Sequence, residues 1–359
     1  MKYFILTYGC QMNISDSEKI ATLLQRQGHT PTKNEADADL IVLNCCSVRQ
    51  AAVHRVYDKI NKYTGKKKLI LAGCVLEKDK NALKEKVSEI WHPDKYFECL
   101  PAESLAKAGP PFYKNKNIAY VPIMTGCNNF CSYCAVPYTR GREKSRPAGQ
   151  IINEVKSLLK KGYKEILLLG QNINSYISKF PISNFQFPNK SQISNYKNKA
   201  INFASLLKTI NDLPGDFRLT FMTSHPKDMS NELISAMARC EKLKKEIHLP
   251  IQSGDNEILR KMNRHYTVAN YKDLIKKIRR AIPGIKITTD IIVGFPGETK
   301  KQFANSVATA KQINFDGAYI AKYSPRPGTS AAKLKDDVPL EEKRRRWRIL
   351  DTLINKFEH

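Results

Sequence analysis

The first part of the chain, up to about residue 112, alternates apolar runs with amphipathic stretches. The apolar runs predict buried strands at Lys2–Tyr8, Asp39–Asn44 and Lys68–Ala72. The first helix is predicted from a capping box at Ser15 and Glu18 to Gly28, and a second helical pattern runs to about Tyr63. Such alternation is typical of a parallel sheet covered by helices, so it predicts an N-terminal α/β domain.

A second series of alternating strands and helices begins at about Ile118. Its strands are predicted at Ala119–Met124, Glu165–Leu169, Arg218–Thr223, Glu246–Ile251, Lys286–Val293 and Ala318–Tyr323. Its helices are predicted at Gln150–Lys161, Phe203–Asn211, Asn231–Cys240, Val268–Ala281 and Lys301–Ile313. Six βα repeats predict either a partial (βα)6 barrel or an open, curved parallel sheet, and the pattern is compatible with both.

These patterns divide the chain into domains at residues 1–112 and 113–340, followed by a C-terminal helix at 341–359. Residues 177–202 are rich in Asn, Ser, Lys and Phe without periodicity, which predicts a surface insertion. The C-terminal helix carries the basic run Lys343-Arg344-Arg345-Arg346. It either contacts nucleic acid or is a solvated final helix, and the second interpretation is slightly favoured.

Composition adds a strong charge imbalance to this picture. Sixty Lys and Arg against 34 Asp and Glu give a net charge of +26, which favours a polyanionic partner over a merely solvated basic surface. No apolar run approaches the roughly 20 residues that cross a bilayer, and the apolar start of the chain is too short for a signal peptide. We therefore expect a cytoplasmic protein without a membrane partner, in which nine cysteines serve as thiolate ligands rather than as disulfides.

Cys127, Cys131 and Cys134 form a C-x3-C-x2-C run just after the first strand of the second series. Three thiolates on one tight loop can bind three irons of a 4Fe–4S cluster and leave the fourth iron without a protein ligand. S-adenosylmethionine can chelate that iron through its amino and carboxylate groups, and an electron from the cluster can then release a 5′-deoxyadenosyl radical. The alternative is a zinc site, but no fourth Cys or His follows at the spacing of a closed zinc site.

Cys10, Cys46 and Cys74 each fall just after one of the first three predicted strands. Ligand sites in parallel sheets form beyond the carboxyl ends of strands, so these thiols are expected to converge at one edge, where Gly73 allows close backbone approach. Three converging thiolates again predict a cluster with one open iron. Cys45 lies beside Cys46 and is an alternative ligand.

Polar and glycine-containing turns follow several strands of the second series. The groups on these turns are candidates for binding the methionine and adenine ends of the cofactor, and the candidate residues are Gly170, Gln171, Asn172, Ser224, His225, Gln252 and Gly294. Turns of this kind occur in many βα loops, so the prediction depends on the cysteine loop nearby. A lone histidine such as His225 is more often structural.

The segment Pro137–Pro147, directly after the cysteine loop, contains three Arg and one Lys around Gly141. These side chains either clamp phosphates near the cluster or form salt bridges that support the loop, and both interpretations are compatible with each other.

Two cysteine sets with these neighbours resemble the radical S-adenosylmethionine (SAM) methylthiotransferase family. The run Tyr8-Gly9-Cys10-Gln11-Met12-Asn13, the segment Pro137–Pro147 and the run Gly170–Tyr176 resemble its MiaB type, which acts on tRNA. The ribosomal-protein branch tends to carry Pro-Lys-Asn after the first cysteine, and the threonylcarbamoyl-adenosine branch carries Lys/Ala-Val-Asn. The resemblance covers nearly the whole chain.

The resemblance implies a radical SAM barrel after the N-terminal domain, and two 4Fe–4S clusters. The radical cluster would be bound by Cys127, Cys131 and Cys134, and an auxiliary cluster that presents sulfur would be bound by Cys10, Cys46 and Cys74. One S-adenosylmethionine would methylate that sulfur and a second would generate the radical that attacks carbon 2 of adenine, so two are used per turnover. The substrate would be N(6)-isopentenyladenosine at position 37 of the tRNA anticodon stem-loop, and the enzyme would be a monomer that takes electrons from flavodoxin or ferredoxin.

This chain departs from the family pattern in three places. The family usually has Thr at the position of Cys45, and the insertion at 177–202 is not part of the common pattern. Family members end in a small RNA-binding β-barrel, the TRAM domain, which would begin close to His359 and is not expected within this sequence. The alternative functions are methylthiotransfer to threonylcarbamoyl-adenosine or to a ribosomal-protein aspartate, a non-catalytic RNA-binding iron–sulfur protein, and a zinc-binding nucleic-acid module.

Overall fold

The computed structural model describes residues 1–47, 50–97, 117–178, 200–222 and 224–356. The chain folds as two compact units, one formed by Met1–Asn128 with Ala135–Gly170 and the other by Asn129–Cys134 with Gln171–His359. Within the described residues, no helix is long and apolar enough to cross a membrane. The predicted domain boundary at residue 112 lies outside the described residues.

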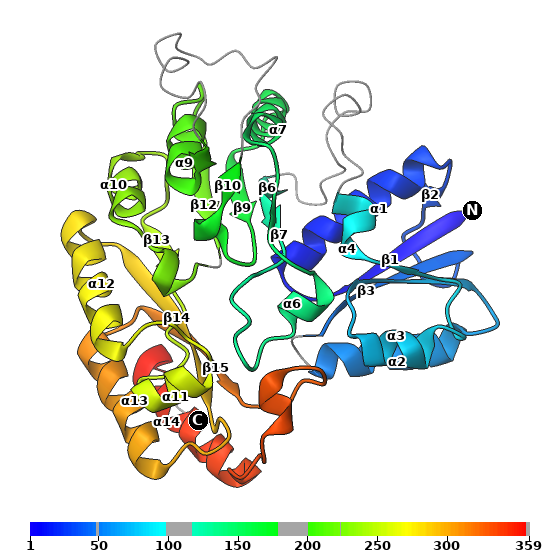
Figure 1. Ribbon diagram of the computed structural model, residues 1–359. Coiled ribbons are helices and arrows are strands. Elements are labelled where there is room, and N and C mark those ends of the chain that lie inside the picture. Colours follow the sequence, from blue (N-terminus) through cyan, green and yellow to red (C-terminus); the bar gives the residue numbers. More distant parts are fainter. Residues whose placement is uncertain (48–49, 98–116, 179–199, 223, 357–359) are drawn as a thin grey trace. The chain divides into compact units, whose positions relative to one another are not determined.

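The first unit contains a five-stranded parallel sheet in the order β2-β1-β3-β4-β5. The strands are β1 (Lys2–Tyr8), β2 (Thr30–Pro31), β3 (Leu40–Cys46), β4 (Lys68–Cys74) and β5 (Glu89–Trp91). The helices are α1 (Gln11–Arg26), α2 (Gln50–Tyr63), α3 (Glu77–Leu83) and α4 (Pro93–Phe97). Helices α1 and α4 cover one face, and α2 and α3 cover the other (Figure 1).

Alternation along β3 builds a core on each face of this sheet. Ile41 and Leu43 belong to the cluster beneath α2, whereas Leu40 and Val42 belong to the cluster beneath α1. Every residue of β3 is buried, as expected for a central strand that is covered on both faces. The predicted N-terminal parallel α/β sheet is therefore confirmed.

Several boundaries in this unit differ from the prediction, and three of them lie at the cysteines. Helix α1 begins at Gln11, four positions before Ser15, because Asn13 Oδ1 accepts a hydrogen bond from the Cys10 backbone N–H at 3.3 Å and so caps the helix one turn earlier. Strands β3 and β4 run on to Cys46 and Cys74 instead of ending at Asn44 and Ala72. These cysteines are consequently the last residues of paired strands.

The first unit also contains the beginning of the second strand–helix series. Strand β6 (Ile118–Pro122) pairs in parallel with β9 (Glu165–Leu169), and α7 (Ala148–Lys160) lies between them in sequence. Strand β7 (Met124–Thr125), before the cysteine loop, pairs antiparallel with β8 (Lys144–Ser145), after it. Helix α6 (Val136–Thr139) lies between the loop and β8.

The second unit continues the strand–helix repeat. Its strands are β12 (Arg218–Phe221), β13 (Glu246–His248), β14 (Lys286–Val293) and β15 (Gly317–Lys322), and the last three form a parallel sheet in the order β13-β14-β15. Its helices are α9 (Phe203–Asn211), α10 (Asn231–Arg239), α11 (Asn256–Lys261), α12 (Val268–Ala281), α13 (Lys300–Ile313) and α14 (Leu340–Asn355). The predicted α/β class is confirmed, and the partial (βα)6 barrel stays a prediction.

The ends of the predicted insertion pair with each other. Strand β10 (Ile177–Ser178) and strand β11 (Ile201–Asn202) form an antiparallel ladder in which Ser178 is the partner of Ile201. Asn202 also caps α9 by accepting a hydrogen bond from the Ser205 backbone N–H. The rest of the predicted insertion, residues 179–199, lies outside the described residues.

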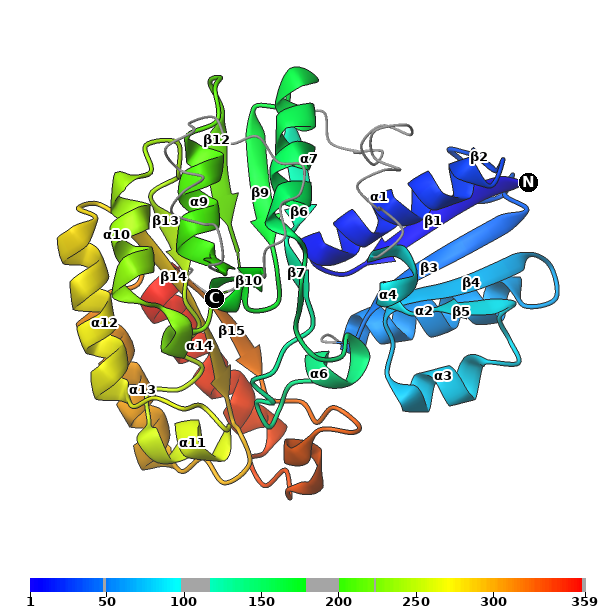
Figure 2. The same cartoon turned by 45° about the horizontal axis from the view of Figure 1, so that its top comes forward.

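The basic C-terminal helix is neither a free arm nor a fully solvated helix. Helix α14 lies beside β15 (Figure 2), and the side chains of Lys343 and Arg346 are each about 4 % exposed. Lys343 pairs with Asp336 at 2.5 Å, and Arg346 pairs with Glu298 at 2.7 Å. Half of the predicted basic run is therefore part of the core of the second unit.

Candidate cluster and cofactor sites

The three N-terminal cysteines lie at the carboxyl ends of neighbouring strands. Cys46 and Cys74 are direct partners in the register of β3 and β4, and Cys10 follows the end of β1 after Gly9. Burial raises the pKa of the Cys74 thiol to about 12; Arg140 opposes this rise, and the Cys46 and Cys10 groups add to it. Cys10 is exposed whereas Cys46 and Cys74 are buried, so one side of the set faces solvent.

Strand alternation distinguishes Cys46 from Cys45. The Cys45 side chain is 3 % exposed and belongs to the apolar cluster with Ile41 and Leu43 beneath α2. Burial raises the pKa of its thiol above the usual range, and Cys74 and Cys46 add to the rise. Cys46 follows by one residue and therefore points to the opposite face, the face of Asn44.

Two buried amides, those of Asn13 and Asn44, connect the start of α1 to the end of β3. Asn13 Nδ2 donates to Asn44 Oδ1 at 2.9 Å and to the Cys45 carbonyl at 3.1 Å, and Asn44 Nδ2 donates to the Asn13 carbonyl at 2.7 Å. Asn13 Oδ1 in turn accepts from the Cys10 backbone N–H, and the Cys10 thiol lies 3.5 Å away. Because both side chains are fully buried, their hydrogen bonds fix Cys10 relative to the end of β3.

A buried arginine contacts the third cysteine. Arg140 Nε donates to Cys74 Sγ at 2.9 Å, and a terminal nitrogen of the same guanidinium pairs with Asp16 at 2.5 Å. Arg146, six residues later, is also buried and pairs with Glu154 at 2.6 Å. For these two arginines the salt-bridge interpretation holds, because their burial leaves neither of them exposed to a phosphate.

The radical-cluster loop is fixed from within each unit. In the first unit, the Cys127 backbone N–H donates to the Gly141 carbonyl at 3.1 Å. In the second unit, the Cys134 N–H donates to the Cys131 carbonyl at 2.9 Å, and Phe130 adopts a left-handed conformation with φ of +47°. Asn263 Nδ2 satisfies the Phe130 carbonyl at 3.0 Å. A left-handed non-glycine residue is strained, and in this loop it turns the chain tightly between cysteines.

Arg264 is a residue that the sequence analysis missed. Its side chain is buried and donates to the Pro250 carbonyl at 2.9 Å, to the Tyr266 hydroxyl at 2.8 Å and to Cys131 Sγ at 3.5 Å. No local pattern distinguishes this arginine among 60 Lys and Arg residues. Each predicted cysteine set therefore has a buried guanidinium at one sulfur, supplied from within the same unit.

The predicted cofactor residues include buried polar atoms for which the described residues offer no hydrogen-bond partner. Gln171 Oε1 and Ser224 Oγ are buried and accept or donate no hydrogen bond within the described part of the chain. Gln252 is buried and has a left-handed backbone conformation with φ of +70°. Its backbone carbonyl accepts a hydrogen bond from the Ile292 N–H. Buried polar groups normally have partners, so these side chains fit a site for a polar ligand.

Other predicted cofactor residues already have partners. Asn172 Nδ2 donates to Asp228 at 2.8 Å, and the Gly294 N–H donates to Glu298 at 2.6 Å, so those two donors are occupied. Burial lowers the pKa of His225 to about 2, with Arg264 adding to the effect, and its Nδ1 accepts from the Lys227 N–H. His225 is therefore neutral, with its proton on Nε2, and supports the fold. Gly170 is the last residue of the first unit and directly follows β9.

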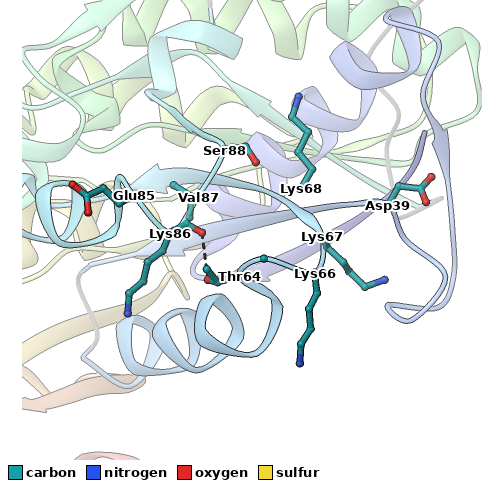
Figure 3. A pocket seen from close by; sticks show the side chains of 10 residues that line it. Asp39, Thr64, Lys66, Lys67, Lys68, Glu85, Lys86, Val87 and Ser88 are labelled. Carbon is teal, nitrogen blue, oxygen red and sulfur yellow. Dashed lines mark hydrogen bonds between the residues drawn. The ribbon is translucent and has the colours of Figure 1, made fainter.

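A basic hollow of about 590 Å³ lies at the other end of the N-terminal strands. It is lined by Lys66, Lys67, Lys68 and Lys86 with Asp39 and Glu85, and Figure 3 shows these side chains pointing in different directions. Asp39 precedes β3 and Lys68 begins β4, so the hollow is at the amino ends of the strands, away from the cysteines at their carboxyl ends.

Within the described ranges, no three His, Cys, Asp or Glu side chains lie close enough to share one metal ion. The cysteines of a cluster bind different irons, so their sulfurs stand farther apart than the ligands of a single zinc ion. Each cysteine set offers three thiolates, which are the ligands that iron–sulfur clusters take.

Comparison with known proteins agrees with this chemistry. Residues 121–310 match the model of the radical SAM superfamily, and residues 2–92 match that of the uncharacterized protein family UPF0004. The chain is 42 % identical to a tRNA-2-methylthio-N(6)-dimethylallyladenosine synthase of Clostridium novyi, over 99 % of this chain and 81 % of the relative. It belongs to that family of radical SAM enzymes. A synthase of the same name from Syntrophomonas wolfei is 43 % identical over 96 % of this chain and 80 % of its own length.

Membership of this radical SAM family confirms the expected MiaB type and implies a 4Fe–4S cluster and S-adenosylmethionine as cofactors. Solved structures support the fold. The radical SAM methyltransferase TsrM from Kitasatospora setae matches with a TM-score of 0.63 and 13 % identity, over 92 % of this chain and 77 % of that protein. The cobalamin-dependent SAM radical enzyme OxsB matches with a TM-score of 0.58 and 10 % identity, over 99 % of this chain and 55 % of that protein.

Proposed function

We propose that this chain transfers a methylthio group to carbon 2 of N(6)-isopentenyladenosine in tRNA. The observation that carries the proposal is the second cysteine set, Cys10, Cys46 and Cys74, at the carboxyl ends of β1, β3 and β4, in a chain that also has the radical SAM motif. A radical is needed because the C2–H bond of adenine is unactivated, and the inserted sulfur needs a donor other than S-adenosylmethionine. The relatives named as tRNA-2-methylthio-N(6)-dimethylallyladenosine synthases support this substrate.

Each cysteine set has a proposed role in this reaction. Cys127, Cys131 and Cys134 bind the radical cluster, and Cys10, Cys46 and Cys74 bind the auxiliary cluster. When bound, these groups and two molecules of S-adenosylmethionine per turnover supply the 5′-deoxyadenosyl radical, the sulfur and its methyl group. Asn13 and Asn44 orient Cys10 in this scheme, and Arg264 orients Cys131.

The S-adenosylmethionine site is proposed at the strand ends of the radical SAM segment. Its candidate residues are Gly170, Gln171, Asn172, Ser224, His225, Gln252 and Gly294. Gln171 and Ser224 offer buried polar atoms for which the described residues hold no partner. His225 instead keeps the turn rigid, because the Asn174 side chain accepts from the His225 N–H and donates to the His225 carbonyl. Gly294 supplies a turn that side chains of α14 cover.

The net charge of +26 supports tRNA as the macromolecular substrate, because contacts to phosphates release condensed counterions. The proposed contact is the anticodon stem-loop with isopentenyladenosine at position 37. Flavodoxin or ferredoxin is the proposed electron donor, a monomer is the proposed functional state, and the tRNA substrate leads us to expect the reaction in the cytoplasm.

Replacement of one auxiliary cysteine tests the division of labour between the two sets. Cys10→Ala is expected to retain S-adenosylmethionine cleavage, measured as 5′-deoxyadenosine, and to lose the 2-methylthio product, whereas Cys131→Ala loses both. Cys240→Ala is the control, since Cys240 is buried at the end of α10 and belongs to neither set. Full methylthiotransfer by anaerobically reconstituted Cys10→Ala protein would refute the proposed role of the second set.

A further inference from the structure

Arg140 is a buried cation with one carboxylate partner and one sulfur partner. Its side chain is 3 % exposed, and that of Asp16 is 2 % exposed. The guanidinium gives one terminal nitrogen to Asp16 at 2.5 Å and its Nε to Cys74 Sγ at 2.9 Å. All three residues belong to the first unit, in which Asp16 is in α1 and Cys74 ends β4.

The second buried arginine of the same segment shows that the sulfur contact is not a requirement of burial. The Arg146 side chain is 5 % exposed, pairs with Glu154 at 2.6 Å, and donates to the Pro122 carbonyl at 2.6 Å. Arg140 instead directs an N–H of fixed geometry at the sulfur of a proposed iron ligand.

We propose that Arg140, oriented by Asp16, raises the reduction potential of the auxiliary cluster by donating its Nε–H to the Cys74 sulfur. The inference rests on the proposed function, which assigns Cys74 to that cluster. Reduction adds one negative charge to a cluster and its thiolates, so a nearby positive charge and an N–H donor stabilise the reduced form more than the oxidised form. Asp16 partly cancels the positive charge while it fixes the direction of the guanidinium.

This arrangement makes opposite predictions for the two partners. Arg140→Met removes both the charge and the donor, so the midpoint potential falls. Asp16→Asn keeps a hydrogen-bond acceptor for the guanidinium but removes the compensating negative charge, so the potential rises. Arg140→Lys keeps the charge without the fork geometry, and its potential lies between those of the parent and Arg140→Met.

The measurement is an anaerobic redox titration of the full-length chain followed by electron paramagnetic resonance. The parent carries Cys127→Ala, Cys131→Ala and Cys134→Ala, so the auxiliary cluster gives the signal and about four irons per chain are expected. Arg146→Met is the matched control, since it breaks a similarly buried arginine–carboxylate pair, the one with Glu154. Its potential should equal that of the parent.

The inference is overturned if Arg140→Met leaves the potential unchanged or raises it, if Asp16→Asn lowers it, or if Arg146→Met shifts it as much as Arg140→Met. If Arg140→Met does not retain a cluster, the shifts in midpoint potential of Asp16→Asn and Arg140→Lys still test the inference, since the first should be upward and the second downward. A parent that binds no iron would refute the auxiliary cluster and the inference together, whereas a cluster that is insensitive to Arg140 would refute the inference alone.

Discussion

Gly73 adopts a left-handed φ of +91° beside the cysteine site, and a Cβ there would overlap Asn44 Oδ1 and the Cys45 carbonyl oxygen. Gly65 has a similar φ of +75°, with no atom within 4 Å of the same position. Gly65→Ala should therefore cost about 1 kcal/mol of unfolding free energy for strain alone. Gly73→Ala adds about 1–3 kcal/mol for overpacking and displaces Asn44.

The two variants are compared by denaturant unfolding and by their iron content after reconstitution. Gly73→Ala should lose auxiliary iron, whereas Gly65→Ala should keep it. Equal stability and equal iron content in the two variants would show that close approach at Gly73 does not matter.

The buried His225 gives a pH dependence with a definite sign. Burial lowers its folded pKa to about 2, whereas an unfolded histidine titrates near about 6.5. Below about pH 6.5 the unfolded state therefore binds a proton that the folded state does not, and stability falls by up to about 1.4 kcal/mol per pH unit from this group. Above that pH its contribution is complete.

The check is urea unfolding of wild-type protein and of His225→Gln at about pH 7 and about pH 5. The wild type should lose more stability than the variant over this interval. An equal loss in both proteins would mean that His225 is protonated in the folded state.

The choice between Cys45 and Cys46, which the sequence left open, depends on the alternation of side chains along β3. Cys45 and Cys46 are equivalent in the sequence, and they become different only because β3 continues through both, with Cys45 in the apolar cluster and Cys46 on the other face. The roles of Arg140 and Arg264 depend on partners distant in sequence, Asp16 and Pro250 among them, which no local pattern reveals.

The C-terminal helix depends on one buried pair. Arg346 lies between Glu298 and Glu342, and Glu298 also accepts from the Gly294 N–H. Arg346→Ala leaves the Glu298 carboxylate buried without its cation, at a cost of about 3–5 kcal/mol in unfolding free energy. Arg345→Ala removes an exposed pair with Glu342 and should cost less than about 1 kcal/mol.

Thermal or denaturant unfolding of the two α14 variants measures this difference directly. Similar small losses in both would mean that α14 is a solvated helix, as the sequence analysis slightly favoured.

Residues 179–200 can be replaced by design, because β10 and β11 pair on either side of them. Replacing everything between Ser178 and Ile201 with Asn-Gly joins the ladder through a two-residue turn. We expect iron content and S-adenosylmethionine cleavage to be retained, with tRNA modification as a second readout. Loss of the radical cluster in this variant would show that the segment supports the fold.

Strand–helix alternation predicted most elements, since β1, β9, β14, α9 and α12 match the sequence pattern in their bounds. Other bounds differ by a few residues, as for β13, which ends at His248 instead of Ile251, and the differences at α1, β3 and β4 have an explanation in side chains. Helix α1 starts early because Asn13 replaces the expected cap, and β3 and β4 run longer because their cysteines stay in register. Capping by a cysteine–asparagine pair is not a pattern that propensity anticipates.

At the scale of the whole molecule, the two cysteine sets and the charge predicted the chemistry from the sequence alone. Spacing identified the radical motif, and strand ends grouped the three remote cysteines. The network that fixes them, Asn13 with Asn44 and Arg140 with Asp16, could not be predicted, because it joins α1, the end of β3 and the segment after α6. The match to radical SAM relatives supports the chemistry.

Mass spectrometry of one strictly anaerobic reaction tests the proposed function most directly. The reaction contains the chain with its clusters reconstituted, S-adenosylmethionine, a strong reductant and tRNA carrying isopentenyladenosine. We predict a 2-methylthio product together with 5′-deoxyadenosine. Neither product, from protein with both clusters present, would contradict the proposed function.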